Sequence, residues 1–285
     1  MIKILGLVVA IASVFGGYVL ADGNLATLWQ PAEVVIVIGA ALGAHVLGNP
    51  GSVLRDTLSQ TRELIAREKE DPELYPQLFG LMNSLMLQVQ THGLKVLDDH
   101  IEKPFESSLF LTYPAVLRQP LLLGFLVDNL RLQSMGKMTP HELQHLMEEE
   151  IHRLQEDRMR PANSLHRTGE ALPGFGILAA VLGIIITMGA IDGPLTMIGY
   201  HVAAALVGTF MGVFSCYCIL EPLSSALHHQ VDQKMAQLHC AKAIIAAQLA
   251  GKTPLLALDG GRRMIQEENR PSFFELERFV SEEQR

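Results

Sequence analysis

Four apolar segments constrain this chain more than any other feature of its sequence. They cover residues 4–21, 34–47, 172–191 and 202–220, and the last two contain no charged side chain. A helix needs about 20 residues to cross a hydrocarbon core of about 30 Å. The first, third and fourth segments meet that length, whereas the second is short and a buried or re-entrant helix remains an alternative for it. We therefore predict an integral membrane protein with four transmembrane helices.

The first segment has a second interpretation. Lys3 precedes it and Val19-Leu20-Ala21 ends it, which is also typical of a cleaved signal peptide. Its apolar run is long for a signal peptide, so we favour a retained span. Cleavage would remove one span and leave the orientation of the others unchanged.

The basic residues predict the orientation of the four spans. Of the 22 Lys and Arg residues, 13 lie between residues 50 and 171 and 8 lie beyond residue 220, whereas connectors 22–32 and 192–201 contain none. The positive-inside rule then places both basic blocks and both termini in the cytoplasm of a multi-pass membrane protein. The predicted parts are spans one and two (1–49), a cytoplasmic insert (50–171), spans three and four (172–221) and a cytoplasmic tail (222–285).

Composition excludes several other classes. With 49% hydrophobic residues the chain is not a disordered protein, and three cysteines are too few for a disulfide scaffold. A net charge of −8 gives no basic footprint for nucleic acid. No strand-like alternation stands out, so the predicted fold class is all-α.

Apolar spacing predicts helices in the insert and the tail. In the insert they cover residues 52–69, 73–97 and 114–134. Thr139 is predicted to cap a further helix that runs toward Met159 and ends at Pro161. In the tail, residues 223–250 form one long amphipathic helix.

One motif in the insert points to a different kind of chemistry. His141, Glu142 and His145 fit the HExxH pattern of zinc proteases, in which two histidines one turn apart hold Zn²⁺ and the glutamate acts as general base. The alternative is a polar face on a charged helix. We favour the polar face unless a third ligand lies nearby.

The third and fourth spans lack an ionisable group near their centres, although proton relays normally need one. If the protein conducts ions, another chain must supply a carboxylate. Gly208 with Gly212, and Gly39 with Gly43, allow close helix packing, either within one subunit or against another. Where a threonine lies within a span, we expect its hydroxyl to bond back to its own helix.

Motifs along nearly the whole chain resemble the family of flagellar motor stator A subunits, MotA. They lie at residues 161–165 (PANSL), 172–183 (LPGFGILAAVLG), 207–212 (VGTFMG), 221–223 (EPL), 261–263 (GRR) and 270–277 (RPSFFELE). The resemblance implies an ion-conducting stator subunit, which is not an enzyme, that couples proton flow to torque on the rotor. It also implies a pentamer around a dimer of a B subunit, MotB, which supplies the ion-binding aspartate and a peptidoglycan anchor.

The resemblance assigns roles to two prolines and a threonine. Pro173 and Pro222 correspond to prolines that couple ion passage to conformational change, and Thr209 corresponds to a threonine that faces the ion path. From the pattern alone, Pro173 lies in the first turn of span three and Pro222 lies just beyond the end of span four, and both positions tolerate proline for structural reasons.

The resemblance also implies contacts between the insert and the rotor protein FliG. The family's acidic position falls on Asp98, but its basic position falls on Gln90, which is uncharged, and Lys95 is a candidate replacement. Asp128 and Glu150 occupy further acidic positions, where a solvated helix face is the alternative.

The transported ion is predicted from one position in span three. Sodium-driven relatives carry a hydroxyl residue where this chain has Ala180, and a dehydrated Na⁺ needs oxygen ligands. We therefore predict proton coupling, with Na⁺ less favoured, and no cofactor. An energy-transducing subunit like ExbB or TolQ is the alternative within transport. Four spans and the pair of Pro173 and Pro222 count against it.

Overall fold

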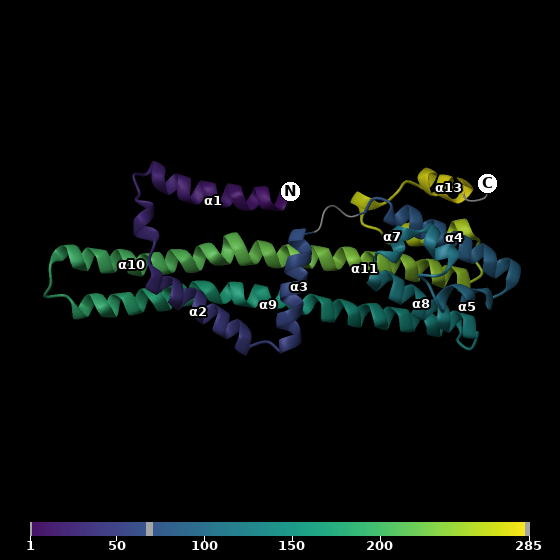
Figure 1. Cartoon of the computed structure of the whole chain (residues 1–285), viewed down its shortest axis with the longest axis horizontal. Helices are drawn as coiled ribbons and strands as arrows, with labels where there is room; N and C mark the ends of the chain where they lie inside the picture. The colour runs from purple at the N-terminus through teal and green to yellow at the C-terminus, as the bar shows by residue number, and fades with distance from the viewer. Residues whose placement is uncertain (1, 67–70, 283–285) are drawn as a thin grey trace. The chain divides into compact units, whose positions relative to one another are not determined.

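All regular structure in the described part of the chain is helical. The computed structural model describes residues 2–66 and 71–282, and Figure 1 labels their helices. The chain divides into two units, which are treated separately: Met1–Ala66 with Met159–His229, and Arg67–Arg158 with Gln230–Arg285. The predicted all-α class is confirmed. Residues 67–69 of the predicted helix 52–69 lie outside the described residues.

The first unit contains the apolar segments. Its elements are α1 (Ile2–Leu20), the 3₁₀ turn η1 (Leu25–Leu28), α2 (Pro31–Leu47), α3 (Gly51–Ala66), the second part of α9 (Pro140–Gly189), α10 (Leu195–Phe214), the π-helical turn η2 (Ser215–Leu220) and the start of α11 (Glu221–Leu249). The continuous helices that contain α9 and α10 are long and apolar enough to cross a membrane, whereas α1 and α2 form shorter apolar helices.

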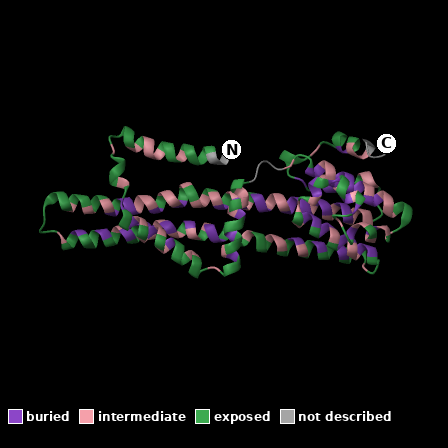
Figure 2. Ribbon diagram, in the orientation of Figure 1, coloured by how far each residue is buried: buried purple, intermediate pink, exposed green. Residues whose placement is uncertain are grey.

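Many residues of these helices are exposed (Figure 2), and large apolar residues are among them. On α9 they include Ile177, Val181, Ile184 and Ile185. Exposed apolar surface of this extent is unfavourable in water and is normal where lipid or another subunit covers a helix. This distribution therefore agrees with a membrane setting for the unit.

The prediction that Pro161 ends its helix is wrong. The helix α9 runs from Pro140 to Gly189 without interruption, with both Pro161 and Pro173 inside it. Pro173 thus lies in the interior of a helix and not in a first turn. Proline in a helix interior removes one backbone hydrogen bond. Packing of Ala162 and Leu165 against Leu227 stabilises the helix around Pro161.

The expectation that Pro222 lies beyond the end of its helix is also wrong. The helix continues from α10 through η2 into α11, and Pro222 is the second residue of α11. The Glu221 amide donates to the Cys216 carbonyl, five residues back, as a π turn requires. Pro222 has no amide hydrogen to donate, and the wider turn before it lets the helix continue without that hydrogen bond. The predicted helix 223–250 is confirmed as α11.

The second unit is built from shorter helices around an apolar core. They are α4 (Leu74–His92), α5 (Val96–Ile101), α6 (Ser108–Thr112), α7 (Pro114–Leu117), α8 (Pro120–Met135), the first part of α9, the remainder of α11, α12 (Pro254–Arg262), η3 (Glu267–Asn269) and α13 (Phe273–Glu282). Its fully buried side chains include Phe79, Met82, Phe110 and Leu126. The sequence pattern had merged several of these short helices into longer ones.

Thr139 caps α9 as predicted. The Thr139 amide and hydroxyl both donate to Glu142 Oε2 at 2.8 Å, and the Glu142 amide donates to Thr139 Oγ1 at 3.3 Å. This reciprocal pair is a capping box, which satisfies amides that the first turn of a helix leaves free.

Candidate functional site

In the first unit, α9 and α10 meet backbone to backbone. A Cβ atom placed on Gly176 would lie 2.9 Å from the Gly208 carbonyl oxygen, 3.1 Å from Thr209 Cα and 3.3 Å from Gly212 Cα. Only glycine permits two helices to approach so closely. The glycines of Val207–Gly212 therefore form a contact within the chain, which resolves the alternative left open by the sequence for Gly208 and Gly212.

The same close contact continues toward the end of α9. A Cβ atom on Gly183 would lie 2.7 Å from Ala205 Cβ, and one on Gly208 would lie 2.8 Å from Ala179 Cβ. By contrast, a Cβ atom on Gly39 or Gly43 of α2 would meet nothing within 4 Å. The second pair of glycines thus makes no tight contact within this chain.

Pro173 lies between two close approaches of α9 to the facing helix. On its C-terminal side, a Cβ atom on Gly176 would lie 3.3 Å from Gly212 Cα. On its N-terminal side, a Cβ atom on Gly169 would lie 3.3 Å from Leu220 Cβ. The facing segment between these contacts contains η2, which is followed by α11 with Pro222 as its second residue. The structure therefore brings the irregular parts of both helices to one level.

The other two positions assigned to the ion path lie beside the glycine contact. Thr209 follows Gly208 on α10 and Ala180 follows Ala179 on α9, and both are half-buried. Thr187, deeper in α9, donates its hydroxyl to the Gly183 carbonyl at 2.8 Å. This bond confirms the expectation for Thr187 that a threonine within a span bonds back to its own helix.

Polar side chains form hydrogen bonds and ion pairs on the turns of α9 that precede Pro173. His166 Nδ1 lies 2.8 Å from Glu221 Oε1, and His166 Nε2 lies 3.5 Å from Glu170 Oε1. On the other side of α9, His45 Nδ1 lies 2.9 Å from Thr168 Oγ1. The bond to Glu221 connects α9 to α11 next to Pro222, and the bond to His45 connects α9 to α2 shortly before Pro173.

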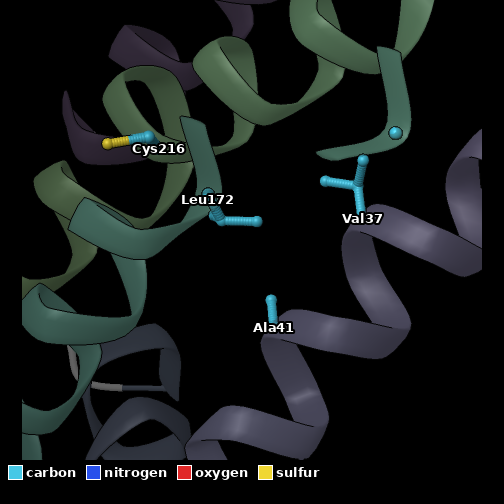
Figure 3. Packing of buried hydrophobic residues seen from close by; sticks show 5 residues of the cluster. Val37, Ala41, Leu172 and Cys216 are labelled. Carbon is cyan, nitrogen blue, oxygen red and sulfur yellow. The ribbon is translucent and has the colours of Figure 1, made fainter. Parts of the chain in front are cut away.

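An apolar cluster packs α2 onto the same helices. Val37 and Ala41 of α2 lie in one buried cluster with Leu172, Ala179 and Cys216 (Figure 3). One turn before Val37 lies Glu33, whose residue surface is 6% exposed and whose Oε2 has no hydrogen-bond partner. We did not single out Glu33 from the sequence, although an acid at the edge of an apolar segment is a signal for function.

The predicted rotor-facing residues lie in the second unit, and Asp98 is the most constrained of them. Asp98 of α5 is half-buried and lies 3.5 Å from Lys95 Nζ. A hydrogen bond with Ser134 of α8 lowers the pKa of Asp98, and the charges of Lys95 and Arg131 act in the same direction. Asp98 is thus held as an anion between α5 and α8.

Arg131 was overlooked by sequence reasoning. Its guanidinium lies 3.3 Å from Glu102 Oε1, and its charge also acts on Asp98. Gln90, at the family's basic position, is exposed at the end of α4. The basic charges beside Asp98 therefore come from Lys95 and Arg131, and Lys95 is 83% exposed.

The two remaining acidic positions differ in their surroundings. Asp128 is exposed on α8. Glu150 is half-buried on α9, and its Oε2 accepts a hydrogen bond from Asn129 Nδ2 at 2.9 Å. Asn129 also donates to the Phe125 carbonyl. Glu150 therefore holds α9 to a buried polar side chain of α8, which a purely solvated face does not do.

The HExxH motif has a structural role at its glutamate. The capping box engages Glu142, and its hydrogen bonds with Thr139 lower the pKa of Glu142. Among residues 2–66 and 71–282, no group of three His, Cys, Asp or Glu side chains could hold a metal ion. His141 and His145 thus have no third ligand there, as a zinc site would require.

Two known protein families match this chain, one in its N-terminal part and one in its centre. Residues 4–93 match the family described as "Motility protein A N-terminal", and residues 121–239 match the "MotA/TolQ/ExbB proton channel family". Together the two matches cover most of the chain.

Two relatives are similar over almost the whole length. The chain is 49% identical over 282 residues to "Chemotaxis protein LafT" of Vibrio parahaemolyticus, covering 99% of each chain. It is 38% identical over 280 residues to "Motility protein A" of Salmonella typhimurium, covering 98% of this chain and 95% of that protein.

Two solved structures share the fold. "Structure of C. jejuni MotAB" superposes with a TM-score of 0.77 at 18% identity, covering 95% of this chain and 98% of that chain. The flagellar MotAB stator complex from Bacillus subtilis gives a TM-score of 0.70 at 21% identity, covering 90% and 92%.

Proposed function

The chain belongs to the MotA family, and we propose that it is a stator subunit of the bacterial flagellar motor that couples proton flow to torque. The observation that carries this proposal is the 38% identity to a motility protein A over 98% of the chain. The match of residues 4–93 to the N-terminal part of motility protein A favours this function over an ExbB-like or TolQ-like one. The chain thus belongs to a family of motor and channel subunits, and not to an enzyme family.

We place the subunit in the bacterial inner membrane. The proposed spans are α1, α2, the apolar end of α9, and α10 with η2. The basic residues of 50–171 and of the tail support cytoplasmic positions for both regions and for both termini. The insert 50–171 and the tail 222–285 would then face the base of the flagellum.

The proposed partner is a MotB-like B subunit. Both solved structures that share the fold are of MotAB, and the one from Bacillus subtilis is a flagellar stator complex. No charged residue lies between residues 171 and 191 or between 202 and 220, so α9 and α10 need an ionisable group from elsewhere. We propose that a B-subunit dimer supplies an aspartate within a pentamer of this chain.

The glycine contact and the two prolines would convert ion binding into movement. Pro173 has no amide hydrogen to donate to the Gly169 carbonyl, four residues back. Pro222 likewise has none to donate to the Cys218 carbonyl. Helices bend at such positions. Because Pro173 and η2 lie at one level, a change in the packing of α9 on α10 would bend both helices together.

The proposed rotor contact centres on Asp98, and its partner is the rotor protein FliG. Lys95 and Arg131 supply the basic charge that Gln90 lacks. Asp128 offers an exposed acid, whereas Glu150 supports the fold through Asn129. Charged side chains at an exposed surface favour a contact that forms and breaks rapidly.

Protons are the proposed ion. The methyl group of Ala180 offers no oxygen ligand where a dehydrated Na⁺ would need one.

The test is restoration of swimming in a bacterium that lacks its own stators. The chain and its B subunit are expressed together, with the B subunit alone as the control. We expect swimming that a protonophore stops and that continues without Na⁺. Absence of swimming in an assembled complex would contradict the stator function, and a requirement for Na⁺ would contradict the choice of ion.

A further inference from the structure

Glu33 is an acidic side chain that the proposed mechanism does not use. It lies in the first turn of α2, and only 6% of its surface is exposed. Its Oε2 atom is fully covered and has no hydrogen-bond partner. An ionised carboxylate in such a position would be strongly unfavourable, because the covered Oε2 atom has no hydrogen-bond donor to compensate its lost hydration.

The carboxyl group of Glu33 reaches the contact between α9 and α10. A Cβ atom placed on Gly208 would lie 2.8 Å from Glu33 Oε2 and 2.8 Å from Ala179 Cβ. The absence of a side chain at Gly208 therefore provides the space that the carboxyl group occupies. Gly208 directly precedes Thr209 and follows Val207, so Glu33 touches the backbone of the proposed ion path from the α2 side.

Glu33 shares one face of α2 with three other residues. Glu33, Val37, Ala41 and His45 are spaced four residues apart, so they lie on one side of the helix. Val37 and Ala41 are buried in the apolar cluster of Figure 3. His45 bonds to Thr168 at the far end of the same face. Two titratable groups thus lie at opposite ends of a buried, apolar stretch of the helix.

The elements packed against Glu33 carry few other titratable groups. The apolar part of α9, residues 171–189, has none. On α10 they are Tyr200, which donates to Gln30 Oε1 at 3.2 Å, and His201. Tyr18 of α1 bonds to Thr27. No Lys or Arg occurs in α2, in α10 or in residues 171–189.

We propose that Glu33 is a proton-binding site within this subunit, separate from the carboxylate of the partner. Packed against Gly208, the carboxyl group is neutral and carries its proton. When it releases the proton, the resulting anion needs water, and α2 loosens from α9 and α10. This inference rests on the proposed proton-driven function for the source of the proton, but the binding site itself can be tested without it.

Infrared spectroscopy of the purified complex tests the site directly. A buried neutral carboxyl group gives a C=O stretching band distinct from that of carboxylates. We expect such a band at neutral pH that shifts when glutamate, but not aspartate, is labelled with ¹³C, and that disappears in Glu33→Gln. Labelling of the wild-type complex needs no variant, and it separates Glu33 from an aspartate of the partner.

Swimming and proton flux then test whether the proton is exchanged. Glu33→Gln keeps the size of the side chain but cannot release a proton, so we expect assembly with the B subunit and loss of most proton flux and swimming. Glu33→Asp should retain more of both. The control is Asp192→Asn, which removes an exposed carboxylate after α9 and should behave as wild type.

Two results would overturn the proposal. One is the absence of a glutamate-dependent neutral carboxyl band in the wild-type complex. The other is wild-type proton flux in Glu33→Gln, which would make Glu33 a structural group only. A wild-type complex that carries no proton current would instead contradict the proposed function, and the labelled band would still report on the proton at Glu33.

Discussion

A Cβ atom placed on Gly212 would lie 3.0 Å from Cα of Gly176, so the backbones of α9 and α10 are in direct contact there. The atoms near such a Cβ belong to the backbone, which cannot move aside as a flexible side chain can. Every substitution at either glycine must therefore separate the two helices.

Gly176→Ala tests this contact. Crowding of the backbone of Gly208 and Thr209 should destabilise the subunit by about 1–3 kcal/mol and abolish most swimming. Thermal unfolding of the purified complex and a swimming assay measure the two effects. Gly174→Ala is the matched control, because a Cβ atom at Gly174 meets nothing within 4 Å. Equal stability of both variants would contradict the close contact.

Pro173→Ala restores a backbone hydrogen bond in the interior of α9. We expect a stiffer helix, a complex that still assembles with its B subunit, and reduced torque. Torque is measured on tethered cells, and assembly is measured by co-purification. Pro140→Ala is the control, since Pro140 begins α9 and its amide would have no acceptor within the helix. Unchanged torque in Pro173→Ala would argue against the coupling role.

Asp98→Lys reverses the charge between α5 and α8. The substitution places a cation beside Lys95 and Arg131, so we expect weaker coupling to the rotor and slower swarming, with normal membrane levels of the protein. Asp99→Lys makes the same charge change at the neighbouring exposed position. If both variants swarm equally, the effect is one of net charge and Asp98 has no special role.

Asp259 gives the second unit a stability that depends on pH. Its carboxylate lies 2.7 Å from Arg262 Nη2 and 2.8 Å from Arg263 Nε. Burial acts to raise the pKa of Asp259, but the hydrogen bonds from Arg263 and Arg262 outweigh it and lower the pKa. This stabilisation is therefore fully present above the ordinary aspartate pKa of about 4 and is lost as pH falls through the lowered value.

Asp259→Asn should thus lower the melting temperature at neutral pH, by the equivalent of about 1.5–3 kcal/mol. The difference from wild type should shrink as pH falls below about 4. Glu268→Gln, at an exposed position, is the control and should change little. A difference that stays constant down to acid pH would show that the ion pairs do not cause it.

The sequence determined the helical class and the four apolar segments, because hydrophobic length and periodicity are local properties. It also predicted the Thr139 cap and the helix at residues 223–250 for the same reason. It misplaced the ends of helices at Pro161 and Pro222. Local preference predicts a break at proline, whereas packing on Leu227 and the π turn at Ser215–Leu220 compensate for the missing hydrogen bonds.

Pairing between distant segments was decided by the tertiary structure alone. Spacing identified Gly208 and Gly212 as a packing motif, but only the fold shows that Gly176 is their partner. Spacing gave no reason to connect Glu33 with Gly208, or Arg131 with Asp98. Such contacts depend on which helix faces meet in space, and the hydrophobic effect that buries those faces is not directional. The partners follow from the fit of side chains and backbones once the helices have packed.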